Sequence, residues 1–214
     1  MTRRMYIERF LIQVSGGFQD DDAELTYDLI NGWLPDAIAS AAKQNYKESI
    51  QIDGTAYVNN SFYTTFSGLS ISSDTTDNLC YKITLPEIPL GMGRTEGLAE
   101  IRFKDSNGLT SLPAIPVSIS EWGYMESMPI ISNKIFILPE GNLIRIKTPL
   151  ILNAASNPYT AIVKMISGGD STNLDSELNV PADYFPVMQE YLKAQLGFEK
   201  AQKQDLANDG NDMP

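Results

Sequence analysis

Histidine is missing from this 214-residue sequence, and cysteine occurs once, as Cys80. Without histidine, Ser-His-Asp triads, Cys-His dyads and zinc sites that use imidazole are excluded. A single cysteine excludes an intrachain disulfide, which fits assembly in a reducing compartment. Cys80 lies in an apolar run, so we expect it to be a buried small residue rather than a nucleophile. A metal site would have to be built from carboxylates alone, and we expect no metal ion, no cofactor and no catalytic residue.

Long apolar runs and a surplus of basic residues are also lacking. No run approaches the ~20 apolar residues that a membrane-spanning helix needs. The basic N-terminus is not expected to be a signal peptide, because Glu8, Arg9 and Gln13 interrupt its apolar positions. Lys and Arg number 16 against 27 Asp and Glu, which gives a formal net charge of −11. We expect such a chain to be repelled by nucleic acid and by anionic membrane surfaces.

Several motifs suggest chemistry, and each has an ordinary structural interpretation. The segment GMGRTEG, 91–97, lacks the Gly-Lys-Ser/Thr ending of a phosphate loop, so a glycine-rich turn is favoured. The acidic segments DDDAE (20–24) and NDGND (208–212) lack the spaced oxygen ligands of a calcium loop. Glu121 and Glu126 could act as a glycosidase pair only if they faced each other across a cleft, which a sequence does not show.

The N-terminal region predicts helices. Residues 3–15 carry apolar positions at helical spacing, with Thr2 as the cap and Gly16-Gly17 as the stop; a strand is the rival, because the segment is rich in β-formers. A second helical face follows, made of Leu29, Ile30, Trp33, Leu34, Ala37, Ile38, Ala41, Ala42 and Asn45. The acidic cluster 20–22 suits the N-terminus of this helix. Pro35 predicts a kink or a tight restart within it.

From about residue 50 the pattern changes to short β-branched and aromatic runs. These runs span 56–71, 79–86, 98–117, 134–149 and 159–166. Asn107-Gly108 and Glu140-Gly141-Asn142 predict hairpin turns. Residues 118–129 predict one or two helical turns, in which Trp122, Tyr124 and Met125 form either an exposed apolar patch or part of the core.

The C-terminal region predicts one more helix and a tail. Pro181 fits the first turn, and Tyr184, Val187, Met188, Tyr191, Leu192 and Gln195 share one side. Gly197 offers a stop. The polar residues 199–214 lack a core pattern, so we expect a disordered or extended arm that orders, if at all, on a neighbour.

These segments predict an α+β fold. A helical lobe is expected from residues 1–50 and 175–198, a β-rich lobe from residues 51–174 is inserted into it, and residues 199–214 form a polar acidic tail. The two ends of the chain would then close on one helical core. No internal repeat is visible.

Four segments carry a resemblance to a known family. They are YIERFLIQVSGGFQDDDAELTYDLINGWLPDAIASAAKQNY, YVNNSFYTTFSGL, LDSELNVPADYFPVMQEYLKAQL, and DLAN with NDGND near the end. In their order along the chain and in their general residue pattern, these segments resemble virion structural proteins of crAss-like tailed phages that infect Bacteroides-type bacteria. They resemble in particular the ring or head-to-tail adaptor subunits below the portal. The resemblance covers nearly the whole chain, and no single residue in it is diagnostic.

The resemblance implies a non-enzymatic subunit of a closed, twelve-fold ring in the portal–tail (neck) region of the virion, assembled in the host bacterial cytoplasm. Its partners would be further copies of itself, the portal protein and other neck or tail rings. DNA would pass through the lumen without specific binding, and an acidic lumen wall would keep phosphate from adhering. A cyclic ring also needs two unlike surfaces on each subunit, which a helical lobe and a β lobe would supply.

Contacts with neighbours are predicted in three places. They are the helix 181–197, the tail 199–214 and the loop around 86–97, and the candidate contact residues are Tyr184, Met188, Tyr191, Leu206, Asp209, Pro214, Met92 and Arg94. Two alternatives stay open. One is a virion carbohydrate-binding or host-attachment protein, whose mark would be exposed aromatic residues, and the other is a carboxylate-based hydrolase.

Overall fold

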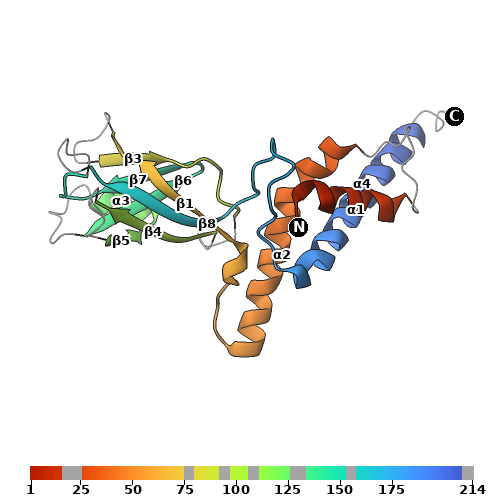
Figure 1. Cartoon of the computed structure of the whole chain (residues 1–214), viewed down its shortest axis with the longest axis horizontal. Helices are drawn as coiled ribbons and strands as arrows, with labels where there is room; N and C mark the ends of the chain where they lie inside the picture. The colour runs from red at the N-terminus through yellow and green to blue at the C-terminus, as the bar shows by residue number, and fades with distance from the viewer. Residues whose placement is uncertain are drawn as a thin grey trace. The chain divides into compact units, whose positions relative to one another are not determined.

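The computed structural model describes residues 1–15, 26–74, 80–91, 97–105, 111–125, 134–152 and 158–208. Helix makes up 41% and strand 30%, and this confirms the α+β class. The chain divides into a helical unit, residues 1–62 and 168–214, and a β unit, residues 63–167, that is inserted into it (Figure 1). The two units therefore meet after residues 62 and 167. The predicted boundaries were after residues 50 and 174.

Helix α1 spans Arg3–Val14, which confirms a helix rather than a strand in this segment. The Thr2 hydroxyl accepts a hydrogen bond from the backbone N–H of Met5 at 3.3 Å, as a capping threonine does. One face of the helix is buried and consists of Arg3, Tyr6, Ile7, Phe10 and Leu11. The predicted stop at Gly16-Gly17 and the acidic cluster 20–22 lie outside the described residues.

Helix α2 spans Tyr27–Asp53 and runs without a break through Pro35, so the helix does not restart there. Proline has no N–H, so the carbonyl of Asn31, four residues earlier, receives no helical hydrogen bond from it. The guanidinium Nη2 of Arg3 donates to that carbonyl at 3.3 Å. A side chain from α1 thus supplies the hydrogen bond that the proline withholds.

The chain returns from the β unit to the helical unit beside the same proline. Arg3 has no exposed surface, and its Nη1 donates to the Gly168 carbonyl at 2.6 Å. A Cβ atom on Gly168 would lie 2.9 Å from Cβ and Cγ of Pro35, so only glycine fits this approach without displacement. Arg3 therefore joins α1, α2 and the returning chain at one buried point.

Helix α4 spans Phe185–Asn208, follows the short 3₁₀ helix Ala182–Tyr184 (η2), and packs against α2. Met188, Leu192 and Leu196 are buried. The prediction that the helix stops at Gly197 is wrong, since the helical backbone continues to Asn208. Residues 199–208 are accordingly not an extended arm, and residues 209–214 lie outside the described part of the chain.

Among its described residues, the β unit has eight strands and one short helix. Their bounds are β1 Tyr63–Ser70, β2 Ser72–Ser73, β3 Cys80–Thr84, β4 Leu98–Lys104, β5 Ser111–Pro116, α3 Ile119–Met125, β6 Ile135–Glu140, β7 Leu143–Lys147 and β8 Thr160–Ile166. The strands pair in the order β1-β8-β4-β5-β6-β7-β3-β2, and β5 with β6 is the parallel pair among them. The predicted run 56–71 starts too early, because the 3₁₀ helix Asn60–Phe62 (η1) precedes β1.

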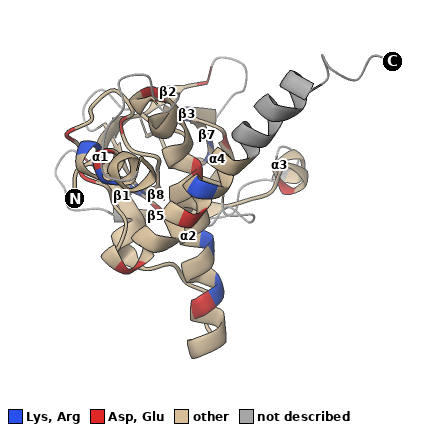
Figure 2. Ribbon diagram, turned by 90° about the vertical axis from the view of Figure 1, so that its right-hand side faces the viewer, with Lys and Arg blue, Asp and Glu red and all other residues tan. Residues whose placement is uncertain are grey.

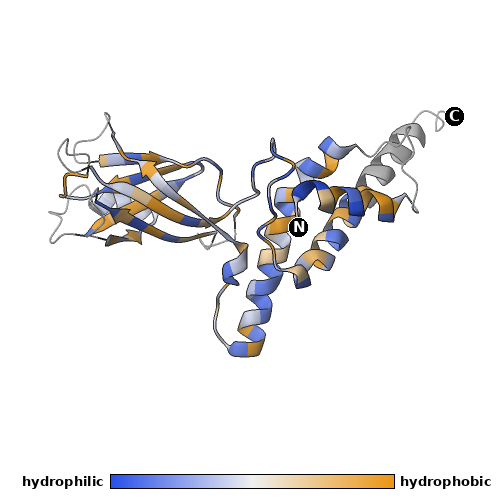
Figure 3. Ribbon diagram, in the orientation of Figure 1, coloured by the Kyte–Doolittle hydropathy of each residue, from blue (hydrophilic) through white to orange (hydrophobic). Residues whose placement is uncertain are grey.

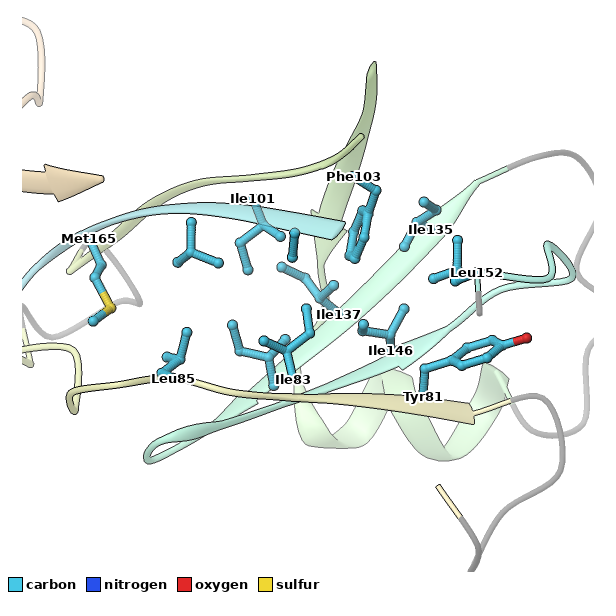
Figure 4. Packing of buried hydrophobic residues seen from close by; sticks show 13 residues of the cluster. Tyr81, Ile83, Leu85, Ile101, Phe103, Ile135, Ile137, Ile146, Leu152 and Met165 are labelled. Atoms are coloured by element: carbon cyan, nitrogen blue, oxygen red, sulfur yellow. The ribbon is translucent and has the colours of Figure 1, made fainter. Parts of the chain in front are cut away.

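The sheet encloses an apolar core. Side chains from β4 and β8 face side chains from β3, β6 and β7 (Figure 4), including Ile83, Phe103 and Ile146, each of which has no exposed surface. Gly141 has φ 61° in the turn between β6 and β7, which confirms that predicted hairpin. The other predicted turn, Asn107-Gly108, lies outside the described residues, although β4 and β5 on either side of it pair antiparallel.

Candidate interaction surfaces

Tyr184 was predicted to contact a neighbour, and the structure places it in a network inside the helical unit. Its ring is packed edge-on against Phe62, with the ring centroids 5.5 Å apart. Its hydroxyl accepts a hydrogen bond from Asn45 Nδ2 at 2.8 Å and donates one to the Glu48 carboxylate. Gln44 Nε2 donates to the other oxygen of Glu48, also at 2.8 Å. Tyr184 therefore joins the start of α4 to α2.

The hydrogen bonds in this network perturb both ionisable groups. Donation by Tyr184, and then by Gln44, lowers the pKa of Glu48 below its ordinary value. Burial, and then the bond to Glu48, raises the pKa of Tyr184. At neutral pH the network therefore holds an ionised glutamate and a neutral tyrosine.

The other predicted contact residues are not brought together. Met188 has no exposed surface and belongs to the core of the helical unit, so in this conformation it is not open to a neighbour. Tyr191 is half-buried on α4. Leu206 lies on the backbone of α4, and its side chain is not described. The remaining four residues lie outside the described part of the chain: Met92, Arg94, Asp209 and Pro214.

The C-terminal end of α2 forms a surface that the sequence did not predict. Three apolar side chains are exposed there: Ile50 is 43% exposed, Ile52 80% and Tyr57, just beyond the helix, 48%. Figure 3, which colours the ribbon by hydropathy, shows hydrophobic positions among hydrophilic ones along α2. Lys43 and Lys47 are also exposed and share one helical stripe with Ile50, whereas Ile52 lies on the opposite side of the helix. These five residues are named the α2 tip. The spacing of Lys43, Lys47 and Ile50 was visible in the sequence, but their exposure depends on where the packing of α4 on α2 ends.

A second surface lies on α3, in the β unit. Ile119 is 76% exposed and Tyr124 69%. Together with the exposed Glu121 they are named the α3 face. Trp122 points the other way and is buried against Cys80 and Leu138. The predicted patch is therefore divided: Trp122 belongs to the core, Tyr124 is exposed, and the side chain of Met125 is not described. The burial of Cys80, at 3% exposure, confirms its predicted place.

Glu121 has a structural task at the start of α3. Its carboxylate accepts hydrogen bonds from the Ser118 backbone N–H at 2.7 Å and from the Ser118 hydroxyl at 2.8 Å, and that hydroxyl accepts from the Glu121 N–H at 3.3 Å. This reciprocal pair is a capping box. The bonds from Ser118 lower the pKa of Glu121, whereas a glycosidase general acid needs a raised pKa. Its proposed partner, Glu126, lies outside the described residues.

A groove of about 430 Å³ lies beside α1 within the helical unit. It is lined by Arg4, Glu8, Ile12, Tyr27 and Leu174. Arg4 Nε lies 3.0 Å from Asp175 Oδ1, so its charge already has a partner. Burial, and then a hydrogen bond with Glu8, raises the pKa of Tyr27 to about 12. The groove thus presents a mixed lining with no surplus of either charge.

Neither a metal centre nor a membrane-spanning helix is found among the described residues. No group of three or more Cys, Asp or Glu side chains in that part of the chain is placed to hold a metal ion. None of the described helices is long and apolar enough to cross a membrane. No protein-family model matches the sequence, and no curated protein matches it.

Proposed function

We propose that this protein is a structural subunit of a tailed-phage virion, one of the copies that close a ring in the neck between portal and tail. The ring would extend the DNA channel and connect the portal to the next ring. The resemblance of the chain's segments to ring and adaptor subunits of crAss-like phages supports this proposal. The order of helices, inserted β unit and C-terminal helix agrees with the order on which that resemblance rests.

The observation that carries the proposal is the presence of two chemically different exposed surfaces in two separate units. The α2 tip combines isoleucines with lysines and has the acids Glu48 and Asp53 beside them, whereas the α3 face combines an isoleucine and a tyrosine with a glutamate. A ring of identical subunits is built from heterologous contacts, in which one surface of each copy meets a different surface of the next. Large apolar side chains left in water in both units are suited to that use.

The net charge of −11 also supports a role as a channel through which DNA passes. A wall of like charge repels phosphate and so lets the duplex slide. Figure 2 shows acidic and basic residues on the same ribbon. The expected repulsion of DNA phosphate therefore rests on the net charge of the whole chain and not on one acidic surface.

Electron cryomicroscopy of virions from a phage that encodes this chain would test the proposal. The expected result is density for the α+β subunit in a ring between portal and tail. Absence from particles, or density confined to a fibre or another peripheral appendage, would contradict it.

One observation favours a second candidate, a virion protein that binds carbohydrate. Tyr124 is 69% exposed and Tyr57 48%, and exposed aromatic rings are a usual platform for sugars. A glycan array separates the two functions. A ring subunit should show no glycan-specific signal, whereas an attachment protein should bind one glycan class and lose the signal on substitution of Tyr124.

A further inference from the structure

We propose that α3 opens away from the sheet while the apolar core of the β unit stays folded. In the closed state α3 covers the outer side of β3, β6 and β7, and its opening uncovers Cys80 and Lys147 there. The proposal goes beyond the proposed function and does not depend on it, because it concerns the β unit of a single chain.

The register of the strands defines the side of the sheet that α3 covers. Ile146 belongs to the apolar core, so its neighbour Lys147 points to the opposite side of the sheet. Lys147 is the cross-strand partner of Cys80 in β3. Cys80, Leu138 of β6 and Trp122 of α3 form a small cluster of their own, separate from the apolar core. α3 is therefore packed on the outer side of the sheet, and its removal leaves the core residues in place.

Trp122 is the principal attachment of α3 to the sheet. Among the described side chains of this helix, Trp122 is buried at 6% exposure, whereas Ile119, Glu121 and Tyr124 are exposed. The hydrogen bonds of the capping box run within residues 118–121, so they do not tie α3 to the strands. Opening therefore breaks chiefly the contact of Trp122 with Cys80 and Leu138.

The contact that Trp122 makes leaves polar groups without partners. Its indole Nε1 is buried and has no acceptor among the described residues. The ammonium of Lys147, a residue that is 6% exposed, lies 5.9 Å from the centroid of the Trp122 ring. This cation–π contact offsets part of the cost of burial, but no carboxylate of the described chain forms an ion pair with the ammonium.

These unpartnered groups favour the open state. A buried donor without an acceptor and a buried charge without a counter-charge cost free energy, and water restores that free energy when α3 opens. The closed state is therefore less stable than its apolar contacts alone would make it. Local opening of α3 should then require less free energy than unfolding of the whole β unit.

Alkylation of Cys80 by iodoacetamide tests the proposal in the full-length protein. Cys80 is the single cysteine of the chain and is covered by Trp122, so it reacts when α3 opens. Mass spectrometry measures the rate in increasing urea, below the unfolding transition. Local opening exposes little surface, so the rate should be nearly independent of urea. A rate that rises steeply with urea would mean that Cys80 reacts after global unfolding, and it would overturn the proposal.

Two substitutions of buried side chains separate local opening from global unfolding. Trp122→Ala removes the attachment of α3 and should raise the alkylation rate at least tenfold. Ile146→Ala is the matched control on the core side of β7, and it should raise the unfolded fraction about thirtyfold or more. The alkylation rate of I146A should nevertheless stay within about twofold of the wild-type rate. Each rate is divided by that of the same variant in concentrated urea, which corrects for differences in thiol reactivity. Rates that follow the unfolded fraction in both variants would show that α3 does not open by itself.

Amide hydrogen exchange gives a second measurement, which needs no reagent at Cys80. Peptides that cover residues 119–125 should exchange at least tenfold faster than peptides from β6 and β7, and Ile146→Ala should leave the exchange of 119–125 unchanged. Equal protection of α3 and these strands would mean that the β unit opens only as a whole, and it would contradict the proposal.

Discussion

The Arg3 side chain holds together three segments of the helical unit: α1, α2 and the chain at Gly168. It is fully buried, and it donates to the Asn31 side chain, to the Asn31 carbonyl that Pro35 leaves without a helical donor, and to the Gly168 carbonyl. Arg3→Met keeps much of the apolar stem but strands these acceptors, so we expect the free energy of unfolding to fall by about 3 kcal/mol or more. Urea denaturation monitored by circular dichroism measures it.

Arg4 provides the matched control for Arg3. It is the next residue in the chain, and its exposed ion pair with Asp175 lies at the surface. Exposed pairs contribute little to stability, so Arg4→Met should leave the urea midpoint nearly unchanged. Equal effects of the two substitutions would contradict the role assigned to Arg3.

A second prediction concerns the hydroxyl of Tyr184 and how its contribution to stability depends on pH. The pKa of Glu48 is lowered in the folded protein, chiefly by this hydroxyl, so the ionised glutamate stabilises the fold above its unfolded-state pKa. That contribution disappears as the pH falls through the folded-state pKa. Tyr184→Phe should therefore cost about 0.5 kcal/mol more at pH 7 than at pH 3, a small amount because the carboxylate is close to solvent.

A double-mutant cycle isolates this bond. In a Glu48→Gln background, the cost of Tyr184→Phe should no longer depend on pH, because no carboxylate remains to titrate. If the pH dependence persists in that background, it arises from another group.

At the scale of elements, two glycines distinguish a helix interior from a helix end. Gly197 lies inside α4, and a Cβ atom there would meet nothing within 4 Å. Gly197→Ala should stabilise the protein by up to about 1 kcal/mol, because alanine is the better helix former. Gly54 ends α2 with φ 65°, a left-handed conformation that disfavours alanine. Gly54→Ala should therefore destabilise by about 1 kcal/mol.

The opposite signs of these two substitutions in thermal denaturation test where α4 ends. If Gly197→Ala destabilised the protein as Gly54→Ala does, the helix would stop at Gly197 as its sequence suggests.

The elements that the sequence predicted correctly are those with local causes. Thr2 caps α1 through a bond to Met5, and Gly141 turns β6 into β7 by its own φ angle. Whether α2 continues or restarts at Pro35 could not be decided from the sequence, because the compensating donor, Arg3, comes from another helix. The α2 tip was missed for a similar reason, since exposure of Ile50 and Ile52 depends on how far α4 covers α2. Non-local packing decided each of these cases.

At the scale of the whole molecule, the inserted β unit should fold by itself. Tyr63 and Ile166, near its two ends, are antiparallel partners in β1 and β8. Such partners have Cα atoms about 5 Å apart, so the unit leaves and rejoins the helical unit at one place. Its core includes Ile83, Phe103 and Ile146, all from its own strands. Residues 63–167 expressed alone should therefore unfold in one cooperative transition.

Two substitutions in that fragment show whether the same core forms. Ile146→Ala removes a fully buried side chain and should lower the free energy of unfolding by about 2–5 kcal/mol. Ile115→Ala removes a side chain that is 39% exposed and should cost clearly less. A broad transition, or equal sensitivity at both positions, would mean that the β unit needs the helical unit in order to fold. A sharp transition with the expected ranking would mean that the β unit forms its own core without the helical unit.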